Sequence, residues 1–283
     1  MVERRLHRRR LAAMPGMVVD DVRVVGGSAD WTPMGVDVGY AVILVRRGGY
    51  VRESEGEEAF VDACGGFLSR EGVEERFAYP LGGVDHCTVV GFTAEAYHEY
   101  VEPVARTSWQ LTTDVAFDVL HRRVLAACER GVDRLEAADG VHQLLERLPP
   151  PTGVVRSSGK RPSTQVARRR LVAAAQEALS NGYLTCDLAG LARLVGSSPH
   201  HLSRAFRRVT GRTISAYRNE LRVRSVLSDL AAGQADIAQL ASKYGFADHA
   251  HLTRTVRRYT ARPPSVLRLE LSMNVQANEA TRS

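Results

Sequence analysis

DLAGLARLVGSSPHHLSRAFRR (residues 187–208) and DIAQLASKYGFADHAHLTRTVRR (residues 236–258) are two copies of one pattern near the end of the chain. Ala192 and Ala241 each stand four positions before a glycine in the middle of their copy. The small alanine lets two helices cross closely, and the glycine lets the turn between them adopt a positive φ. Each copy is therefore predicted to fold as a helix, a turn and a second helix.

The second helix of each copy has an apolar side and a polar side. Leu202 with Phe206, and Leu252 with Val256, are i, i+4 pairs that we expect to pack against the first helix. The other positions are mostly polar or basic, so one side of each second helix stays free to contact a partner.

Helix ends are marked in both copies. Side chains suited to cap a first turn precede the four expected helices: Asp187, Ser198, Asp236 and Asp248. Pro199 fits the first position of its helix. Gly211 ends the second helix of the first copy, whereas the second copy has Ala261 there, which predicts either a left-handed alanine or a differently closed helix.

Residues 214–231 join the two copies and are predicted to form one long helix. Their apolar residues recur at helical spacing: Ile214, Tyr217, Leu221, Leu227 and Leu230. Two helix-turn-helix units in register on one connecting helix are a much more specific signal than a single unit.

These residues resemble the AraC/XylS family of transcription regulators. The resemblance is carried by Leu202-Ser203-Arg204 with Phe206, Gly211 and Tyr217 in the first half, and by Ile237, Ala241, Gly245-Phe246, Asp248, Thr253-Arg254 and Pro264 to Arg268 in the second. It implies a sequence-specific reader of double-stranded DNA, more an activator than a repressor, which contacts RNA polymerase, forms a homodimer and responds to a small-molecule effector.

The charge distribution indicates DNA binding independently of any family. Residues 160–270 hold 19 Lys and Arg against 7 Asp and Glu, a net charge of +12. Residues 11–159 hold 13 against 23, a net charge of −10. A basic segment attracts phosphates and an acidic one repels them, so DNA should bind at one end of the molecule.

The resemblance assigns DNA contacts to both second helices. The contacts expected from the first are His200, His201, Ser203, Arg204, Arg207 and Arg208; those from the second are His249, Ala250, Thr253, Arg254, Arg257 and Arg258. Arg204 and Arg254 are the strongest candidates for base recognition, because arginine pairs bidentately with guanine. The alternative for each arginine is a solvated face or an internal salt bridge. One rigid connecting helix should place the two readers in successive major grooves, about 34 Å apart.

The predicted fold class is α+β multidomain. Residues 11–147 form a sensor and dimerisation domain, the Pro- and Gly-rich segment 148–163 is a linker, residues 164–270 form the all-α DNA-binding domain and residues 271–283 are a tail. No apolar run approaches the roughly 18 residues of a membrane span, so we expect a cytoplasmic protein without a membrane partner.

Short strands are predicted between residues 20 and 93. The expected strands are 40–45, 50–53, 59–63, 66–69, 76–79 and 87–92. They suggest a small β-barrel or sandwich, and residues 42–50 and 85–90 are similar to the cupin-like sensor domain that precedes many such DNA-binding domains. Two helices should follow within Trp109 to Arg147, with a break near residues 138–140, and they either pack in the core or form a dimer interface.

Catalysis and metal binding are not expected. The predicted strands and their edge offer only His86 and His98, so the converging ligands of a metal cupin are missing and no cofactor is assigned. A cupin enzyme fused to a DNA-binding domain, and an alkylation-responsive regulator of the Ada type, are the alternatives. The second needs a zinc site of clustered cysteines, whereas those here are scattered: Cys64, Cys87, Cys128 and Cys186.

Two features of the N-terminal region are the basic segment at its start and the residues that could line an effector pocket. Residues 1–10 contain five arginines and are predicted to be a solvated tail, the alternative being an arm that touches DNA or folds over the sensor domain. Aromatic or polar residues that could line an effector pocket are Trp31, Tyr40, Tyr50, Phe77 and His86. They do not define the chemistry of the effector.

Overall fold

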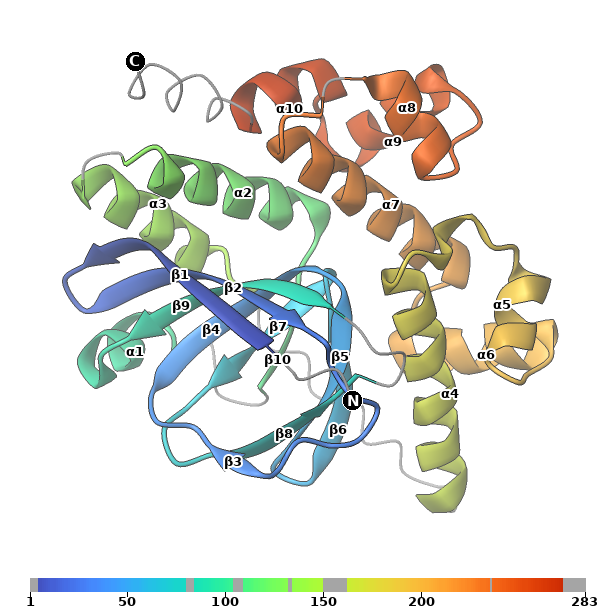
Figure 1. Ribbon diagram of the computed structural model, residues 1–283, viewed down its shortest axis with the longest axis horizontal. Coiled ribbons are helices and arrows are strands. Elements are labelled where there is room, and N and C mark those ends of the chain that lie inside the picture. The colour runs from blue at the N-terminus through green and yellow to red at the C-terminus, as the bar shows by residue number, and fades with distance from the viewer. Residues whose placement is uncertain are drawn as a thin grey trace.

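A strand-rich N-terminal part and a helical C-terminal part make up the computed structural model (Figure 1). The structure describes residues 5–79, 84–103, 109–131, 134–149, 162–234 and 236–271. This division agrees with the α+β class expected from the sequence. None of the described helices combines the length and hydropathy needed to cross a membrane.

The strands form two antiparallel sheets. The six-stranded sheet has the order β1 (Arg5–Met14), β2 (Met17–Val25), β9 (Asp85–Phe92), β4 (Tyr40–Arg47), β7 (Gly65–Ser69) and β10 (Gln110–Thr112). The four-stranded sheet has the order β3 (Gly35–Val36), β8 (Glu74–Ala78), β5 (Gly49–Ser54) and β6 (Glu57–Asp62).

Of the predicted barrel or sandwich, the barrel is wrong, because both sheets are open. No ladder joins β1 or β10 to a strand of the smaller sheet among the described residues. Tyr50, Phe67 and Tyr79 pack between the sheets with ring centroids 5.5 to 6.4 Å apart. These rings occupy part of the space between the two facing sheets.

Residues 5–10 are strand β1, so the prediction of a solvated tail is wrong for them. Arg8 donates from Nε to Oδ2 of Asp20 at 2.7 Å, and Arg10 pairs with the same carboxylate, which is buried. Cross-strand ion pairs of this kind stabilise a two-stranded register. The alternative, an arm that folds over the N-terminal part, describes these residues correctly; residues 1–4 lie outside the described ranges.

Three helices follow or interrupt the sheets: α1 (Ala94–Tyr100), α2 (Val115–Glu129) and α3 (Arg134–Glu146). The predicted break near residues 138–140 is wrong, because α2 ends at Glu129 and Gly140 lies inside α3. A Cβ on Gly140 would lie 3.4 Å from a Val124 methyl group, so the glycine allows close packing of α3 on α2. Trp109, predicted to be helical, directly precedes β10.

The C-terminal part contains seven α-helices among the described residues. They are α4 (Pro162–Ser180), α5 (Leu188–Leu194), α6 (Pro199–Thr210), α7 (Ile214–Ala231), α8 (Ile237–Lys243), α9 (His249–Thr260) and α10 (Pro264–Leu271). The long connecting helix, α7, has the predicted bounds. Most of the predicted linker and of the tail, residues 150–161 and 272–283, lies outside the described residues.

The two parts share a continuous core. Helix α2 packs against α7, α9 and α10, and Cys64 and Val119 belong to the same apolar cluster as the C-terminal helices. The face of α2 that could have formed a dimer interface is thus covered within the chain.

Polar groups reinforce this contact. Asp62, at the end of β6, accepts hydrogen bonds from the hydroxyls of Ser180 (3.0 Å) and Tyr217, and its full burial raises the pKa of its carboxyl group. On α7, the guanidinium of Arg224 donates to the backbone oxygen of Thr113 at 2.6 Å and to Glu220 at 2.8 Å. Helix α7 is therefore held by the sheet and by the segment before α2.

Candidate nucleic-acid interface

The first helix-turn-helix unit consists of α5 and α6. Asp187 caps α5 by accepting a hydrogen bond from the backbone of Gly190 at 2.7 Å. Ser198 caps α6 through the backbone of His201 at 3.2 Å, with Pro199 at the first helical position. Gly196, between the helices, has a φ of 65°. The predicted caps and turn of this unit are confirmed.

The second unit, α8 and α9, repeats this construction. Asp236 accepts from the first turn of α8 at 2.9 and 3.0 Å, and Asp248 accepts from the backbone of His251 at 2.6 Å. Gly245 has a φ of 69°. Both units are thus defined by local hydrogen bonds that the sequence pattern anticipates.

Helices α6 and α9 end alike although their closing residues differ. Gly211 closes α6 at a φ of 71°, and Ala261 closes α9 at a φ of 58°. Of the two alternatives for Ala261, the left-handed alanine is therefore correct. An L-residue with a Cβ is strained in this region, whereas glycine is not.

Exchanging these closing residues should change stability in opposite directions. We expect Ala261→Gly to raise the free energy of unfolding by about 1 kcal/mol, and Gly211→Ala to lower it by about as much. A Cβ on Gly211 would meet no atom within 4 Å, so the loss would report backbone strain alone. Urea unfolding of the full chain measures both values, and equal signs for the two variants would contradict the assignment.

The apolar side of each second helix is buried as predicted. Leu202, Phe206, Leu252 and Val256 are all 0% exposed. The opposite side consists mainly of exposed residues: His200, His201, Ser203, Arg204, Arg207 and Arg208 on α6, and His249, Ala250, Arg254, Arg257 and Arg258 on α9. Thr253 is half-buried.

The arginines on these faces are available for contacts outside the chain. Arg204, Arg207, Arg254 and Arg257 form no salt bridge with any described residue. The guanidinium of Arg258 lies 5.6 Å from the ring of Tyr259. The internal salt bridges that were the alternative role for Arg204 and Arg254 are therefore not seen within the described residues.

The two units lie at opposite ends of α7, at the edge of the molecule away from the sheets (Figure 1). Helix α7 has 18 residues and is about 27 Å long. This length is somewhat shorter than the roughly 34 Å of one turn of B-DNA.

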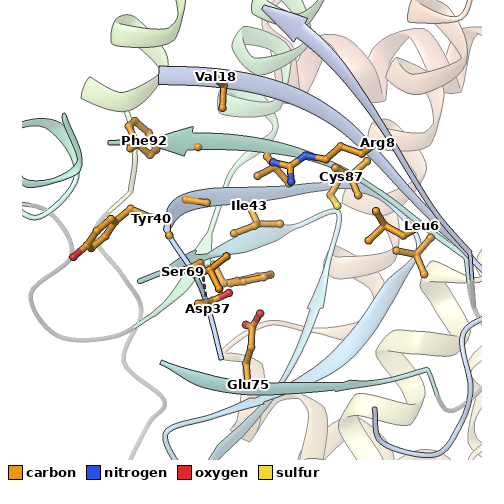
Figure 2. A pocket seen from close by; sticks show the side chains of 18 of the residues that line it. Leu6, Arg8, Val18, Asp37, Tyr40, Ile43, Ser69, Glu75, Cys87 and Phe92 are labelled. Atoms are coloured by element: carbon orange, nitrogen blue, oxygen red, sulfur yellow. Dashed lines mark hydrogen bonds between the residues drawn. The ribbon is translucent and has the colours of Figure 1, made fainter. Parts of the chain in front are cut away.

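A separate cavity of about 650 Å³ lies on the inner side of the sheets (Figure 2). Tyr40, Tyr50 and Phe77 line it as expected from the sequence. The other two pocket candidates, Trp31 and His86, do not line the cavity. The Trp31 ring lies 4.8 Å from the guanidinium of Arg76, and His86 bonds Asp21 at 2.5 Å.

His86, Asp21 and Arg46 form a polar cluster beside the cavity. Burial lowers the pKa of His86, while hydrogen bonds and positive charge from His86 and Arg46 hold the pKa of Asp21 well below its usual range despite partial burial. Nη2 of Arg46 contacts both Asp21 and His86, whereas its Nε is buried without a hydrogen-bond partner among the described residues.

Sequence reasoning missed the carboxylates of the cavity, Asp37, Glu75 and Asp85. The sequence contained a signal for Glu75. It lies two residues before Phe77 on β8 and so faces the same side of the sheet as this pocket candidate. Within the described residues no group of three or more His, Cys, Asp or Glu side chains could hold a metal ion, and the four cysteines are free thiols.

Comparison with known proteins addresses the helical part. A family model described as a helix-turn-helix domain matches residues 191–270. The multiple antibiotic resistance protein MarA of Salmonella typhimurium, and that of Escherichia coli, are each 32% identical over 74 residues. Residues 191–270 are an AraC-type helix-turn-helix domain. The MarA match covers 26% of this chain and 58% of the relative's length.

Solved structures were also compared, with low similarity scores. ToxT from Vibrio cholerae with a bound unsaturated fatty acid has a TM-score of 0.34 at 10% identity, covering 94% of this chain and 98% of ToxT. A cupin superfamily protein from Desulfitobacterium hafniense has a TM-score of 0.27 at 10% identity, covering 31% and 78%. The AraC-type domain is thus assigned from its own sequence match, and the N-terminal part is described from its own geometry.

Proposed function

We propose that this protein is a sequence-specific DNA-binding transcription regulator that reads two successive major grooves. The observation that carries the proposal is the pair of capped second helices, α6 and α9, whose basic faces are exposed at opposite ends of α7. An α-helix fits the major groove of B-DNA, and unpaired arginines on it can reach base edges and phosphates.

Helices α6 and α9 would each use one set of residues for base contacts and another set for phosphate contacts. His200, Ser203 and Arg204 face base edges from α6, and Arg207 and Arg208 contact phosphates. His201 contributes a groove or phosphate contact. The matching positions on α9 are Ala250, Thr253 and Arg254 for bases, with His249 at the helix start and Arg257 and Arg258 for phosphates. Base contacts give specificity, whereas phosphate contacts position the protein and give salt-dependent affinity.

The N-terminal part would be the sensor. Its cavity has a volume typical of small-molecule sites, and the polar contacts of Asp62 and Arg224 connect it with α7. We propose that an effector in this cavity changes the position of α7, and that the protein acts as a homodimeric activator that contacts RNA polymerase. Residues 11–147 would form the sensor, joined by linker 148–163 to the DNA-binding residues 164–270, with β1 extending the sensor to Arg5.

Base recognition can be tested with Arg204→Ala and Arg254→Ala. Each should weaken binding by about 5- to 150-fold, the effect of losing a bidentate base contact, and should relax specificity in only one half of the binding site. Purified protein and sheared genomic DNA at fixed salt reveal the sites, and titration with the resulting duplexes gives the affinities.

Arg70→Ala is a matched control, because Arg70 is exposed but pairs with Glu55 in the N-terminal part. It should leave both halves of the site unchanged. Uniform, salt-sensitive binding that neither recognition variant alters would show that the basic helices attract DNA without reading it, and would refute sequence-specific recognition.

A further inference from the structure

Polar side chains gather at one end of the cavity between the sheets. Glu75 extends from β8 toward Asp37 and Ser69, while Arg8 lies on the opposite side (Figure 2). The hydroxyl of Ser69 donates to Oδ2 of Asp37 at 2.5 Å. Asp85, a third carboxylate of the lining, accepts a hydrogen bond from the Tyr79 hydroxyl at 2.6 Å. The lining is therefore acidic where Glu75 and Asp37 meet, whereas Asp85 lies toward the other end of the strands, because Ser69 aligns through Ala41 with Gly91 of β9.

Two arginines near the cavity, Arg52 and Arg8, each pair with an acidic side chain. Arg52 donates from Nε to Glu75 at 2.7 Å and is 0% exposed. Its guanidinium lies near the rings of Phe67 (4.3 Å) and Trp109 (4.4 Å), and its Nη1 and Nη2 are buried without a hydrogen-bond partner among the described residues. Arg8 is paired with Asp20 at 2.6 Å. One buried arginine thus stands against the carboxylates of Glu75 and Asp37, which leaves negative charge uncompensated when both are ionised.

The titration of Glu75 reflects this imbalance. The pKa of Glu75 is raised to about 7, because burial, with a smaller contribution from the neighbouring Asp37, outweighs the opposing effect of Arg52. Below neutral pH the carboxyl group of Glu75 therefore takes up a proton. A ligand cation at the same place would keep Glu75 ionised instead.

The remaining wall suits an apolar cation. The Tyr50 ring lies 5.6 Å from that of Phe77 and 5.5 Å from that of Tyr79, and all three line the cavity. Tyr50 is 3% exposed. Aromatic faces attract ammonium groups.

We propose that the cavity binds a small organic amine, whose ammonium group lies between Glu75 and Asp37 and whose apolar body lies against the aromatic and aliphatic walls. Amine binding stands on these contacts alone; its regulatory meaning rests on the sensor role proposed above. A fatty acid or another anion would be repelled by the carboxylates of Glu75 and Asp37, and Arg52, which pairs with Glu75, is not part of the cavity lining.

Three ligands of one shape test the proposal: 4-phenylbutylamine, 4-phenylbutanol and 4-phenylbutanoate, titrated calorimetrically into the full chain. The amine should bind at least about tenfold more tightly than the alcohol, and the acid more weakly still. Because the amine is charged throughout while Glu75 titrates near pH 7, its affinity should rise about tenfold from pH 6 to pH 8. Near pH 7, binding should release a proton, seen by comparing buffers of different ionisation enthalpy.

Glu75→Gln should abolish the preference for the amine, its pH dependence and the proton release. Glu74→Gln is the matched control, because Glu74 precedes it on β8 and is exposed. Asp37→Asn should also weaken amine binding, which covers the case in which Glu75→Gln fails to fold. Three outcomes would overturn the proposal. The acid could bind most tightly and lose that affinity in Arg8→Gln, the three ligands could bind equally, or none could bind to the folded protein. DNA affinity of the unliganded chain is measured separately, so the two proposals can fail independently.

Discussion

Arg224→Ala should lower the free energy of unfolding by about 3–5 kcal/mol, the usual cost of removing one partner from a buried ion pair. Arg224 is 2% exposed and lies 2.8 Å from Glu220 and 3.9 Å from Asp118. Without the guanidinium, Glu220 and Asp118 each lose one of two positive partners, since Arg212 and Arg122 remain, and the backbone oxygen of Thr113 loses its donor. Chemical denaturation of the full chain at neutral pH measures the loss.

Two further substitutions make this test specific. Arg262→Ala removes an arginine that pairs with Glu270 but is 44% exposed, and should cost less than about 1 kcal/mol. Arg224→Lys keeps the charge with fewer donors and should lie between alanine and the native residue. A loss below about 1 kcal/mol for Arg224→Ala would show that this contact does not hold α7 against the N-terminal part.

The same contact explains how an event in the sheets could reach the DNA-binding helices. Asp62 is the last residue of strand β6 and accepts a hydrogen bond from Tyr217, while Arg224 lies two helical turns further along α7. Displacement of either anchor would tilt the helix that carries both units. Hydrogen exchange along α7 in Arg224→Ala should therefore increase more than in α5.

Local patterns predicted the AraC-type domain well because its determinants lie close together in the sequence. Caps such as Ser198 act on residues three positions away, and the bounds of α7 follow from the spacing of apolar residues around Tyr217 and Leu221. The left-handed Ala261 could also be foreseen, because it occupies the place of Gly211 in the first copy. In each case one short segment contains both partners of the decisive interaction.

The N-terminal part was harder to predict because its partners are distant in sequence. The arginines of β1 resemble a solvated tail in the sequence because their partner, Asp20, pairs with them only in the folded sheet. Gly140 resembles a helix break because its close contact with Val124 of α2 is not visible in the local sequence. The apolar core that the N-terminal and C-terminal parts share could not be predicted for the same reason. Nothing near Asp62 in the sequence indicates a bond to Tyr217, 155 residues away.

Phe206→Ala should disable the first reader while leaving the second in place. Phe206 is 0% exposed and packs edge-on against Tyr217 with ring centroids 5.3 Å apart. Truncation of a buried phenylalanine costs about 3–5 kcal/mol, a large share of the roughly 5–15 kcal/mol by which a domain is stable. Because Phe206 joins α6 to the start of α7, the loss should fall on the first unit.

Two quantities are measured for Phe206→Ala: the free energy of unfolding and the length of DNA that the protein protects. If α6 and α9 each read one groove, footprinting should show protection confined to the half assigned by Arg254→Ala, at reduced affinity. Phe206→Leu keeps most of the apolar volume and should protect both halves. Complete loss of protection in a variant whose α9 still shows native hydrogen exchange would mean that the second unit does not bind on its own, and the division of labour between the units would be wrong.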